Sequence, residues 1–224
     1  MSSEGTPRII VEQNGPYLVR GNAPLVEKSE EMSEFGEPIT WIRGEVLRSS
    51  GNYTLCRCGK SNNKPFCDDT HEQIGFEGTE TADTGQIADR RKTFRSPKIS
   101  IKDDHSLCMH AGFCATRITD IWKMRGQSND SEVRAEIIAM IERCPSGTLA
   151  YTLDPGGEVQ EPNLPTEVAI IPNGPIWITG GIPVERSDGQ ALETRNRVTL
   201  CRCGASSKMP LCDGSHKEIG FTAP

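Results

Sequence analysis

The sequence that decides the fold runs from Cys201 to His216 and reads Cys-Arg-Cys-Gly-Ala-Ser-Ser-Lys-Met-Pro-Leu-Cys-Asp-Gly-Ser-His. It contains three thiols and one imidazole, which together make a four-ligand metal set. Two cysteines separated by one residue can reach the same metal atom from an extended turn. A histidine four residues after a cysteine lies on the same side of a helical turn. We therefore expect Cys201 and Cys203 to hold one metal atom, and Cys212 and His216 to hold another.

A second copy of this stretch lies earlier in the chain and reads Cys-Arg-Cys-Gly-Lys-Ser-Asn-Asn-Lys-Pro-Phe-Cys-Asp-Asp-Thr-His. Its ligand positions, Cys56, Cys58, Cys67 and His71, have the same spacing as those of the C-terminal copy. The Arg, Gly, Ser, Pro and Asp between the ligands also recur at the same places. A repeat of this quality does not arise by chance, so the chain contains two equivalent metal sites.

Both copies resemble the CDGSH iron-sulfur domain family, the mitoNEET-like proteins. The family pattern continues after Cys-x-Cys with Ser or Thr, then Pro-x-Cys-Asp-Gly, and then His. Residues 212–216 match it letter for letter, whereas the first copy has Asp69 where the family usually has Gly. The resemblance implies a [2Fe-2S] cluster, held by three cysteines and one histidine, in each copy. It also implies that the two copies pair by exchanging strands, as a pseudo-dimer within one chain.

Structural zinc is the alternative for both sites, because three cysteines and one histidine are an accepted tetrahedral zinc set. The spacing argues against it. Zinc fingers usually place two to four residues between paired ligands, whereas here one residue separates the paired cysteines. The sequence therefore favours iron-sulfur clusters.

The other three cysteines, Cys108, Cys114 and Cys144, lie between the two copies. In a bacterial ferredoxin the ligands follow the pattern Cys-x2-Cys-x2-Cys, and a further Cys precedes a Pro. Cys108 and Cys114 fit the first and third positions, Cys144 precedes Pro145, and Ala111 stands at the second position. This region resembles a divergent single-cluster ferredoxin domain, which implies a [3Fe-4S] cluster, or [4Fe-4S] if a fourth ligand exists. His110 is either that ligand or a hydrogen-bonding neighbour. The alternative is three buried structural thiols.

The pattern of turns and periodic residues predicts an α+β protein with three domains. These are a first CDGSH unit at 1–80, a ferredoxin-like domain at 81–162 and a second CDGSH unit at 163–224. Asn-Gly-Pro turns and Ile-Gly-Phe endings recur in both outer units, and the first unit has a longer, acidic connection around 27–37. In the middle domain we expect strands at 98–101 and 149–153 and helices at 111–122 and 131–143, the second capped by Asp130 or Ser131.

Composition limits the partners and the location. The net charge of −6 argues against nucleic-acid binding, and the chain has neither an apolar run of 18 residues nor a signal-peptide pattern. The nine cysteines have ligand spacings rather than the pattern of a disulfide framework. We therefore expect a soluble, cytoplasmic protein with no membrane partner. The basic run at 90–98 is either solvated or a docking patch for an acidic redox protein.

The ligand sets predict a one-electron transfer protein that works with a redox partner protein. The alternative is a cluster storage or transfer protein that supplies an apo iron-sulfur acceptor. We expect His71 and His216 to raise the reduction potential and to couple reduction to protonation. Arg57 and Arg202 either moderate the cluster charge or are exposed. No nucleophile, nucleotide loop or substrate pocket is evident, so we expect no self-contained enzyme. We expect a monomer with an internal pseudo-dimer.

Overall fold

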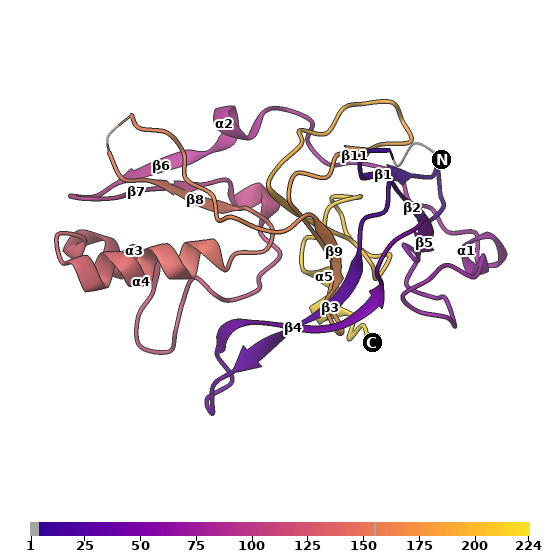
Figure 1. Ribbon diagram of the computed structural model, residues 1–224, viewed down its shortest axis with the longest axis horizontal. Coiled ribbons are helices and arrows are strands. Elements are labelled where there is room, and N and C mark those ends of the chain that lie inside the picture. Colours follow the sequence, from indigo (N-terminus) through magenta and orange to yellow (C-terminus); the bar gives the residue numbers. More distant parts are fainter. Residues whose placement is uncertain (1–4, 155) are drawn as a thin grey trace. The chain divides into compact units, whose positions relative to one another are not determined.

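The computed structural model describes residues 5–154 and 156–224, which belong to two compact units (Figure 1). The first unit contains both copies of the ligand repeat and comprises Met1–Ser29, Arg43–Gly85 and Leu164–Pro224. The second comprises Gln86–Asn163 together with Glu30–Ile42. Strands predominate and helices are few, so the predicted α+β class is confirmed.

Two sheets build the first unit, with strand orders β11-β1-β2-β5 and β12-β10-β9-β3-β4. Every residue of β9, β10 and β12 is buried, including the polar side chains of Glu167, Thr179, Arg197 and Thr199. The first copy supplies β1 (Arg8–Val11), β2 (Tyr17–Arg20), β3 (Leu25–Met32), β4 (Pro38–Arg48) and β5 (Tyr53–Leu55). The second copy supplies β9 (Glu167–Ile170), β10 (Ile176–Thr179), β11 (Val184–Glu185) and β12 (Arg197–Leu200).

Each copy contributes a strand to the sheet of the other copy. Strand β11 pairs in parallel with β1, where Val184 lies opposite Ile9. Strand β3 pairs in parallel with β9, where Leu25 lies opposite Val168. These two pairings occupy equivalent places in the repeat, because Leu25 and Val184 follow their Asn-Gly-Pro turns at the same distance. The predicted strand-exchanged pseudo-dimer is therefore confirmed.

The longer connection of the first copy folds as a pair of strands. It forms most of β3 and the start of β4, joined by a turn in which Ser33 accepts hydrogen bonds from the backbone N–H groups of Phe35 and Glu37. Gly36 adopts the left-handed backbone conformation that this turn needs, with φ of 76°. The outer part of this strand pair, Glu30–Ile42, belongs to the second unit.

The second unit is a three-stranded antiparallel sheet, in the order β6-β7-β8, with helix α4 packed on it (Figure 1). Asp130 caps α4 by accepting hydrogen bonds from the backbone N–H groups of Glu132 and Val133, as predicted. The strands are β6 (Lys92–Arg95), β7 (Ser100–Asp103) and β8 (Leu149–Thr152), and the helices are α2 (Ile87–Arg90), η1 (His105–Leu107), α3 (Ile121–Met124), η2 (Arg125–Gln127) and α4 (Ser131–Glu142). The buried core consists of Ile99, Ile101, Ile121, Ile137, Met140, Ile141, Leu149 and Tyr151.

The predicted helix at 111–122 is wrong. Most of this segment is a looped ligand region, and helix α3 begins only at Ile121. The reason lies in the backbone, because His110 and Gly112 have φ values of 59° and 92°, which no right-handed helix contains. A turn follows, in which the backbone N–H of Thr116 donates to the carbonyl of Thr119. These turns aim Cys114 inward instead of placing it on a helix face.

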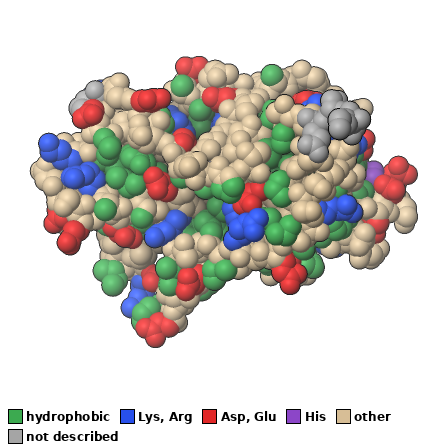
Figure 2. Space-filling view, viewed as in Figure 1, with side chains coloured by type: hydrophobic (Ala, Val, Ile, Leu, Met, Phe, Trp, Pro, Cys, Tyr) green, Lys and Arg blue, Asp and Glu red, His purple; other side chains and the backbone are tan. Residues whose placement is uncertain are grey.

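Basic and acidic side chains are interspersed on the face of the molecule shown in Figure 2. Part of the basic run at 90–98 is used inside the second unit. Arg90 pairs with Asp104 at 2.8 Å, and Arg91 pairs with Glu161 at 3.1 Å. Two of its five cations are thus neutralised by partners of the same unit, which weakens the interpretation of the run as a docking patch.

Candidate metal centres

The two CDGSH ligand sets have nearly identical geometry. In the second copy, Cys201 Sγ lies 3.7 Å from Cys203 Sγ, and Cys212 Sγ lies 3.4 Å from His216 Nδ1. The equivalent distances in the first copy are 3.8 Å and 3.5 Å. Each copy therefore presents one cysteine pair and one Cys–His pair, as the spacing of the ligands predicts.

These distances fit two tetrahedral metal atoms in each copy. With metal–sulfur bonds of about 2.3 Å and metal–nitrogen bonds of about 2.0 Å, two donors on one tetrahedral atom lie about 3.8 Å (S and S) or about 3.5 Å (S and N) apart. A single zinc ion would need all four donors at such spacings. Among the described residues, one group brings three donor atoms of Cys, His, Asp or Glu within 4.8 Å of one another. It consists of Cys67, Asp69 and His71, and it includes no member of a cysteine pair. The cysteine pairs thus stand apart from the Cys–His pairs, which favours a two-iron cluster.

The non-ligand residues of the repeat hold the ligand loops in shape. The backbone N–H of Cys201 donates to the carbonyl of Pro210, and Ser206 Oγ donates to the carbonyl of Leu211. Asp213 accepts hydrogen bonds from Ser207 and Ser215, which ties the loop to helix α5 (Ser215–Glu218). The first copy repeats this arrangement through Pro65, Ser61 and Asp68, ahead of helix α1 (Thr70–Gln73).

Burial of His216 and hydrogen bonding within each cysteine pair favour the protonation states that metal binding requires. Desolvation lowers the pKa of His216 to about 4, so its imidazole is neutral and can donate a lone pair. Hydrogen bonding from the thiol of Cys203 lowers the pKa of Cys201 to about 7, and the equivalent bond from Cys58 lowers the pKa of Cys56 to about 6. One member of each cysteine pair is therefore close to the thiolate form even before a metal binds.

The two cysteine turns pack directly against each other. Gly59 has φ of 76° and Gly204 has φ of 79°. A Cβ atom on Gly59 would collide with the carbonyl of Cys203, and a Cβ atom on Gly204 would collide with the carbonyl of Cys58. The contact is reciprocal, so the glycine after each second cysteine is explained by a close approach of two backbones.

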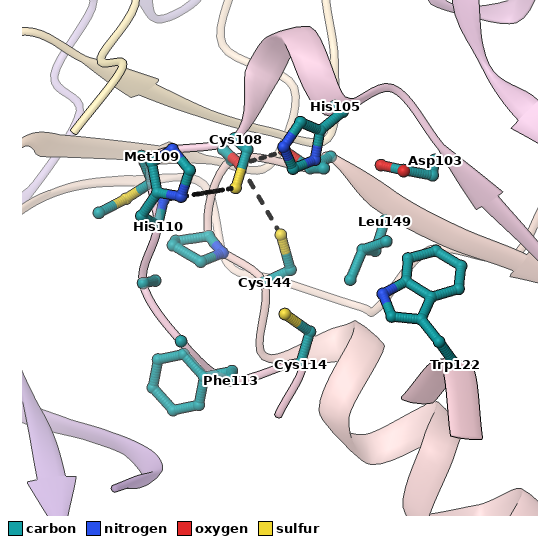
Figure 3. Close-up of a pocket in the computed structure, with 15 residues that line it drawn as sticks. Asp103, His105, Cys108, Met109, His110, Phe113, Cys114, Trp122, Cys144 and Leu149 are labelled. Carbon is teal, nitrogen blue, oxygen red and sulfur yellow. Dashed lines mark hydrogen bonds between the residues drawn. The ribbon is translucent and has the colours of Figure 1, made fainter. Parts of the chain in front are cut away.

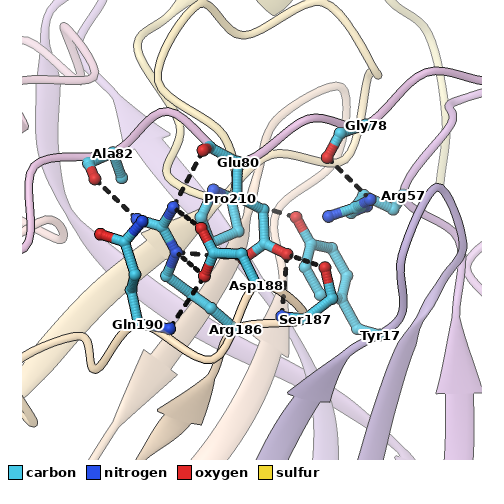
Figure 4. Close-up of polar contacts among 10 residues, drawn as sticks. All are labelled: Tyr17, Arg57, Gly78, Glu80, Ala82, Arg186, Ser187, Asp188, Gln190 and Pro210. Atoms are coloured by element: carbon cyan, nitrogen blue, oxygen red, sulfur yellow. Dashed lines mark hydrogen bonds and ion pairs between the residues drawn. The ribbon is translucent and has the colours of Figure 1, made fainter.

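The arginines between the paired cysteines are buried, so the alternative of exposed side chains is wrong. Arg57 and Arg202 are each 1% exposed. Arg202 donates to the carbonyls of Ile171, Gly174 and Pro224. Arg57 donates to the carbonyl of Gly78 (Figure 4), while its Nε and Nη1 are buried and have no hydrogen-bond partner among the described residues.

A buried guanidinium with two unsatisfied nitrogens is costly. Arg57 lies over the Tyr17 and Phe76 rings, 5.8 Å and 5.4 Å from their centroids, which stabilises the cation in part, and a negative charge nearby would stabilise it further. An oxidised [2Fe-2S] cluster with three thiolates and one neutral imidazole has a net charge of −1, which would supply this charge. The two unsatisfied nitrogens of Arg57 therefore fit an anionic [2Fe-2S] cluster at this site. This evidence does not depend on the ligand distances.

The three remaining cysteines meet at one cavity of the second unit (Figure 3). Cys108 and Cys114 come from the loop after η1, Cys144 follows α4, and the three line a cavity of about 230 Å³. Such a convergence argues against three independent structural thiols. The cavity is also lined by Asp103, His105, Met109, His110, Ala111, Phe113, Trp122, Pro145 and Leu149, among others.

Asp103 is a donor at this cavity that the sequence analysis missed. Its side chain points into the cavity in Figure 3, it is 8% exposed, and its Oδ1 has no hydrogen-bond partner among the described residues. Burial raises the pKa of its carboxyl group. His110, the predicted candidate, is exposed and has its Nδ1 3.9 Å from Cys108 Sγ. That spacing suits two donors on one iron better than donors on separate corners of a cubane.

Residues of the first copy form part of this ligand region. The Trp41 ring lies 4.9 Å from the Phe113 ring, and Trp41 Nε1 donates to the carbonyl of Arg143 at 2.8 Å. Glu37 accepts a hydrogen bond from the backbone N–H of Arg117. Trp41 thus touches the neighbours of two ligands, Cys114 and Cys144. The only sequence signal was the extra length of the first copy.

Taken together, the donor sets define an iron-sulfur protein. The family models agree. The iron-binding zinc finger of CDGSH type matches residues 14–72 and 173–217, and the divergent 4Fe-4S mono-cluster domain matches residues 94–154. The chain therefore has two CDGSH domains that flank a mono-cluster domain.

Searches among curated proteins and among solved structures each found no similar chain. Within the described residues, no helix combines the length and the apolar character that a membrane span requires. All nine cysteines lie in the described part of the chain, and none of them forms a disulfide.

Proposed function

We propose that this chain is an electron-transfer protein with three iron-sulfur centres. Two are [2Fe-2S] clusters held by three cysteines and one histidine, and the third is a cubane-type cluster in the second unit. When bound, each cluster accepts and releases one electron. The observation that supports electron transfer best is the packing of Gly59 against Cys203 and of Gly204 against Cys58, which puts the backbones of two ligand loops in contact.

The residues around the clusters suit one-electron chemistry. A neutral imidazole in place of a thiolate removes one negative charge, so the potential of each CDGSH centre should lie above that of a plant-type ferredoxin. Arg57 places a buried positive charge in the first ligand loop. Both effects favour the more negative, reduced state and so ease electron uptake.

For the third centre we infer that Asp103 is the fourth ligand, which would make it a [4Fe-4S] cluster. Three thiolates alone support [3Fe-4S], the form expected from Ala111. The buried, unpartnered carboxylate oxygen of Asp103 in the same cavity supports the larger cluster. Hard carboxylate oxygens are accepted iron ligands.

Cluster transfer to an apo iron-sulfur acceptor is the second candidate function. The half-buried state of Cys67 and His71 favours it, because an acceptor could reach this Cys–His pair. In either case the partner is a protein, neither a nucleic acid nor a membrane. The chain would act as a monomer with an internal pseudo-dimer in a reducing compartment such as the cytoplasm, and not as a self-contained enzyme.

Metal analysis with an EPR-monitored redox titration tests this proposal. Anaerobically purified protein should hold about 8 irons per chain, with matching sulfide, and show three separable one-electron centres. Reduced protein should transfer electrons to an oxidised ferredoxin. This electron transfer should be faster than the transfer of clusters from oxidised protein to apo-ferredoxin. Zinc in place of iron, or clusters that do not reduce, would overturn the proposal. Faster cluster transfer than electron transfer would favour the second candidate.

A further inference from the structure

The two CDGSH sites differ in their exposure to solvent. In the second site Cys212 and His216 are each 4% exposed. In the first site the equivalent residues, Cys67 and His71, are only partly buried. The sites thus share the same donor set and the same donor spacings, yet the Cys–His pair is open to solvent in one and closed in the other.

The first site also has a donor that the second site lacks. Asp69 stands at the position of Gly214, and both residues adopt the left-handed backbone conformation, with φ values of 63° and 94°. The side chain of Asp69 is exposed, and its Oδ1 lies 3.7 Å from Cys67 Sγ. Asp69, Cys67 and His71 present one donor atom each within 4.8 Å of one another. A carboxylate therefore lies beside the Cys–His pair of the first site, whereas the second site has Gly214 at the equivalent position.

The ligand loop of the second site is held by additional contacts. The backbone N–H groups of Thr81 and Ala82 donate to the carbonyl of Met209 at 2.8 Å and 2.9 Å. Arg186 fixes this segment by donating to the carbonyls of Glu80 and Ala82 and by pairing with the Glu80 carboxylate (Figure 4). The segment Glu80–Ala82, anchored by Arg186, is thus hydrogen-bonded to the second ligand loop and holds it in place.

We propose that the first site is the exchangeable centre of this chain and that Asp69 makes it so, whereas the second site retains its cluster. This inference rests on the proposed iron-sulfur function. Solvent and an acceptor can reach the Cys67–His71 pair, and the Asp69 carboxylate can take the place of the His71 nitrogen. Cys67 and His71 would hold the iron of this pair when a cluster is bound, and Asp69 would offer that iron an alternative oxygen ligand with no change of oxidation state. Gly214 offers no such donor, so the second site has only its buried Cys212–His216 pair.

Iron release to an excess of a strong iron chelator at constant pH tests the proposal on the full, cluster-loaded chain. The remaining reduced [2Fe-2S] spins, counted by EPR, should show one fast phase worth one [2Fe-2S] cluster and one slow phase. A His71→Cys variant should lose the fast phase, whereas His216→Cys should keep it. Equal rates at the two sites, or a fast phase removed by His216→Cys, would overturn the inference while leaving the proposed function intact.

Substitutions of Asp69 separate ligand chemistry from backbone strain. Asp69→Asn keeps the size of the side chain and tolerates the left-handed conformation, but it removes the anionic donor. It should slow the fast phase roughly tenfold, the effect of losing one charged partner, and Asp69→Gly should do the same. If Asp69→Asn releases iron at the wild-type rate and only Asp69→Gly slows it, strain is the cause and the role of the carboxylate is refuted. A chain that binds no [2Fe-2S] clusters at the outset would instead refute the proposed function.

Discussion

The backbone of Gly59 lies directly against the carbonyl of Cys203, and the backbone of Gly204 lies in the same way against the carbonyl of Cys58. Each ligand loop is therefore part of the surface on which the other loop packs. Neither cluster site can change its backbone without disturbing its counterpart.

Gly59→Ala should destabilise both CDGSH sites, because the added Cβ collides with Cys203 and a left-handed alanine is strained. We expect a loss of about 2–4 kcal/mol in the free energy of unfolding and a fall in [2Fe-2S] content at both sites. Chemical denaturation followed by cluster absorbance measures this. Gly189→Ala is the matched control, since Gly189 has φ of 75° but no atom near its Cβ position. Similar losses in both variants would show that strain alone acts.

Arg57→Gln should lower the reduction potential of a CDGSH cluster, because it removes a buried positive charge that favours the added electron. We expect a decrease on the order of 50 mV, measured by EPR-monitored redox titration. Arg202→Gln should lower a potential as well, because the charge of Arg202 interacts with Cys56 and Cys203. It should also cost stability, since all three of its nitrogens have carbonyl partners. An unchanged or raised potential in Arg57→Gln would show that this charge does not act on a cluster.

Asp103→Ala should convert the centre of the second unit from [4Fe-4S] to [3Fe-4S], because a corner without a ligand loses its iron. Iron should fall by about one per chain, and an EPR signal should appear in the oxidised protein. Adding Ala111→Cys to this variant should restore [4Fe-4S] and remove the signal. A wild-type protein that already shows the oxidised signal would instead support [3Fe-4S] and exclude Asp103 as a ligand.

Trp41→Ala should selectively damage the centre of the second unit, because the ring packs on Phe113 and its Nε1 donates to the carbonyl of Arg143. We expect a loss of roughly 3 kcal/mol in that unit and faster decay of its cluster in air. The two [2Fe-2S] clusters should stay at wild-type occupancy, as seen by EPR of the reduced protein. Phe35→Ala, at a ring that is 56% exposed, should leave all three centres intact. Parallel loss of every cluster in Trp41→Ala would mean general unfolding.

Local spacing was enough to predict the two CDGSH ligand sets. Cys201 and Cys203 share a turn, and Cys212 lies only four residues before His216, so these distances depend on a few backbone angles between sequence neighbours. The expected helical turn between Cys212 and His216 is wrong, because the left-handed backbone of Gly214 delays the start of α5 to Ser215. The cap of α4 at Asp130 was predictable for the same reason. The helix expected at 111–122 failed because the left-handed backbone at His110 and Gly112 serves the ligand region, a demand that hydrophobic periodicity does not show.

By itself, the sequence determined the ligands, their pairing within each copy and the internal repeat, because all of these are written in short, fixed spacings. Only the tertiary structure decided which side chains join them from a distance. Asp103 reaches the third cavity from β7, and Trp41 packs from the first copy on Phe113, which lines that cavity, since the folded chain brings segments remote in sequence to one place. Burial was decided in the same way. Gly214 and Asp69 occupy equivalent places in two copies of one motif, yet only packing against the rest of the chain closes one site and leaves the other open.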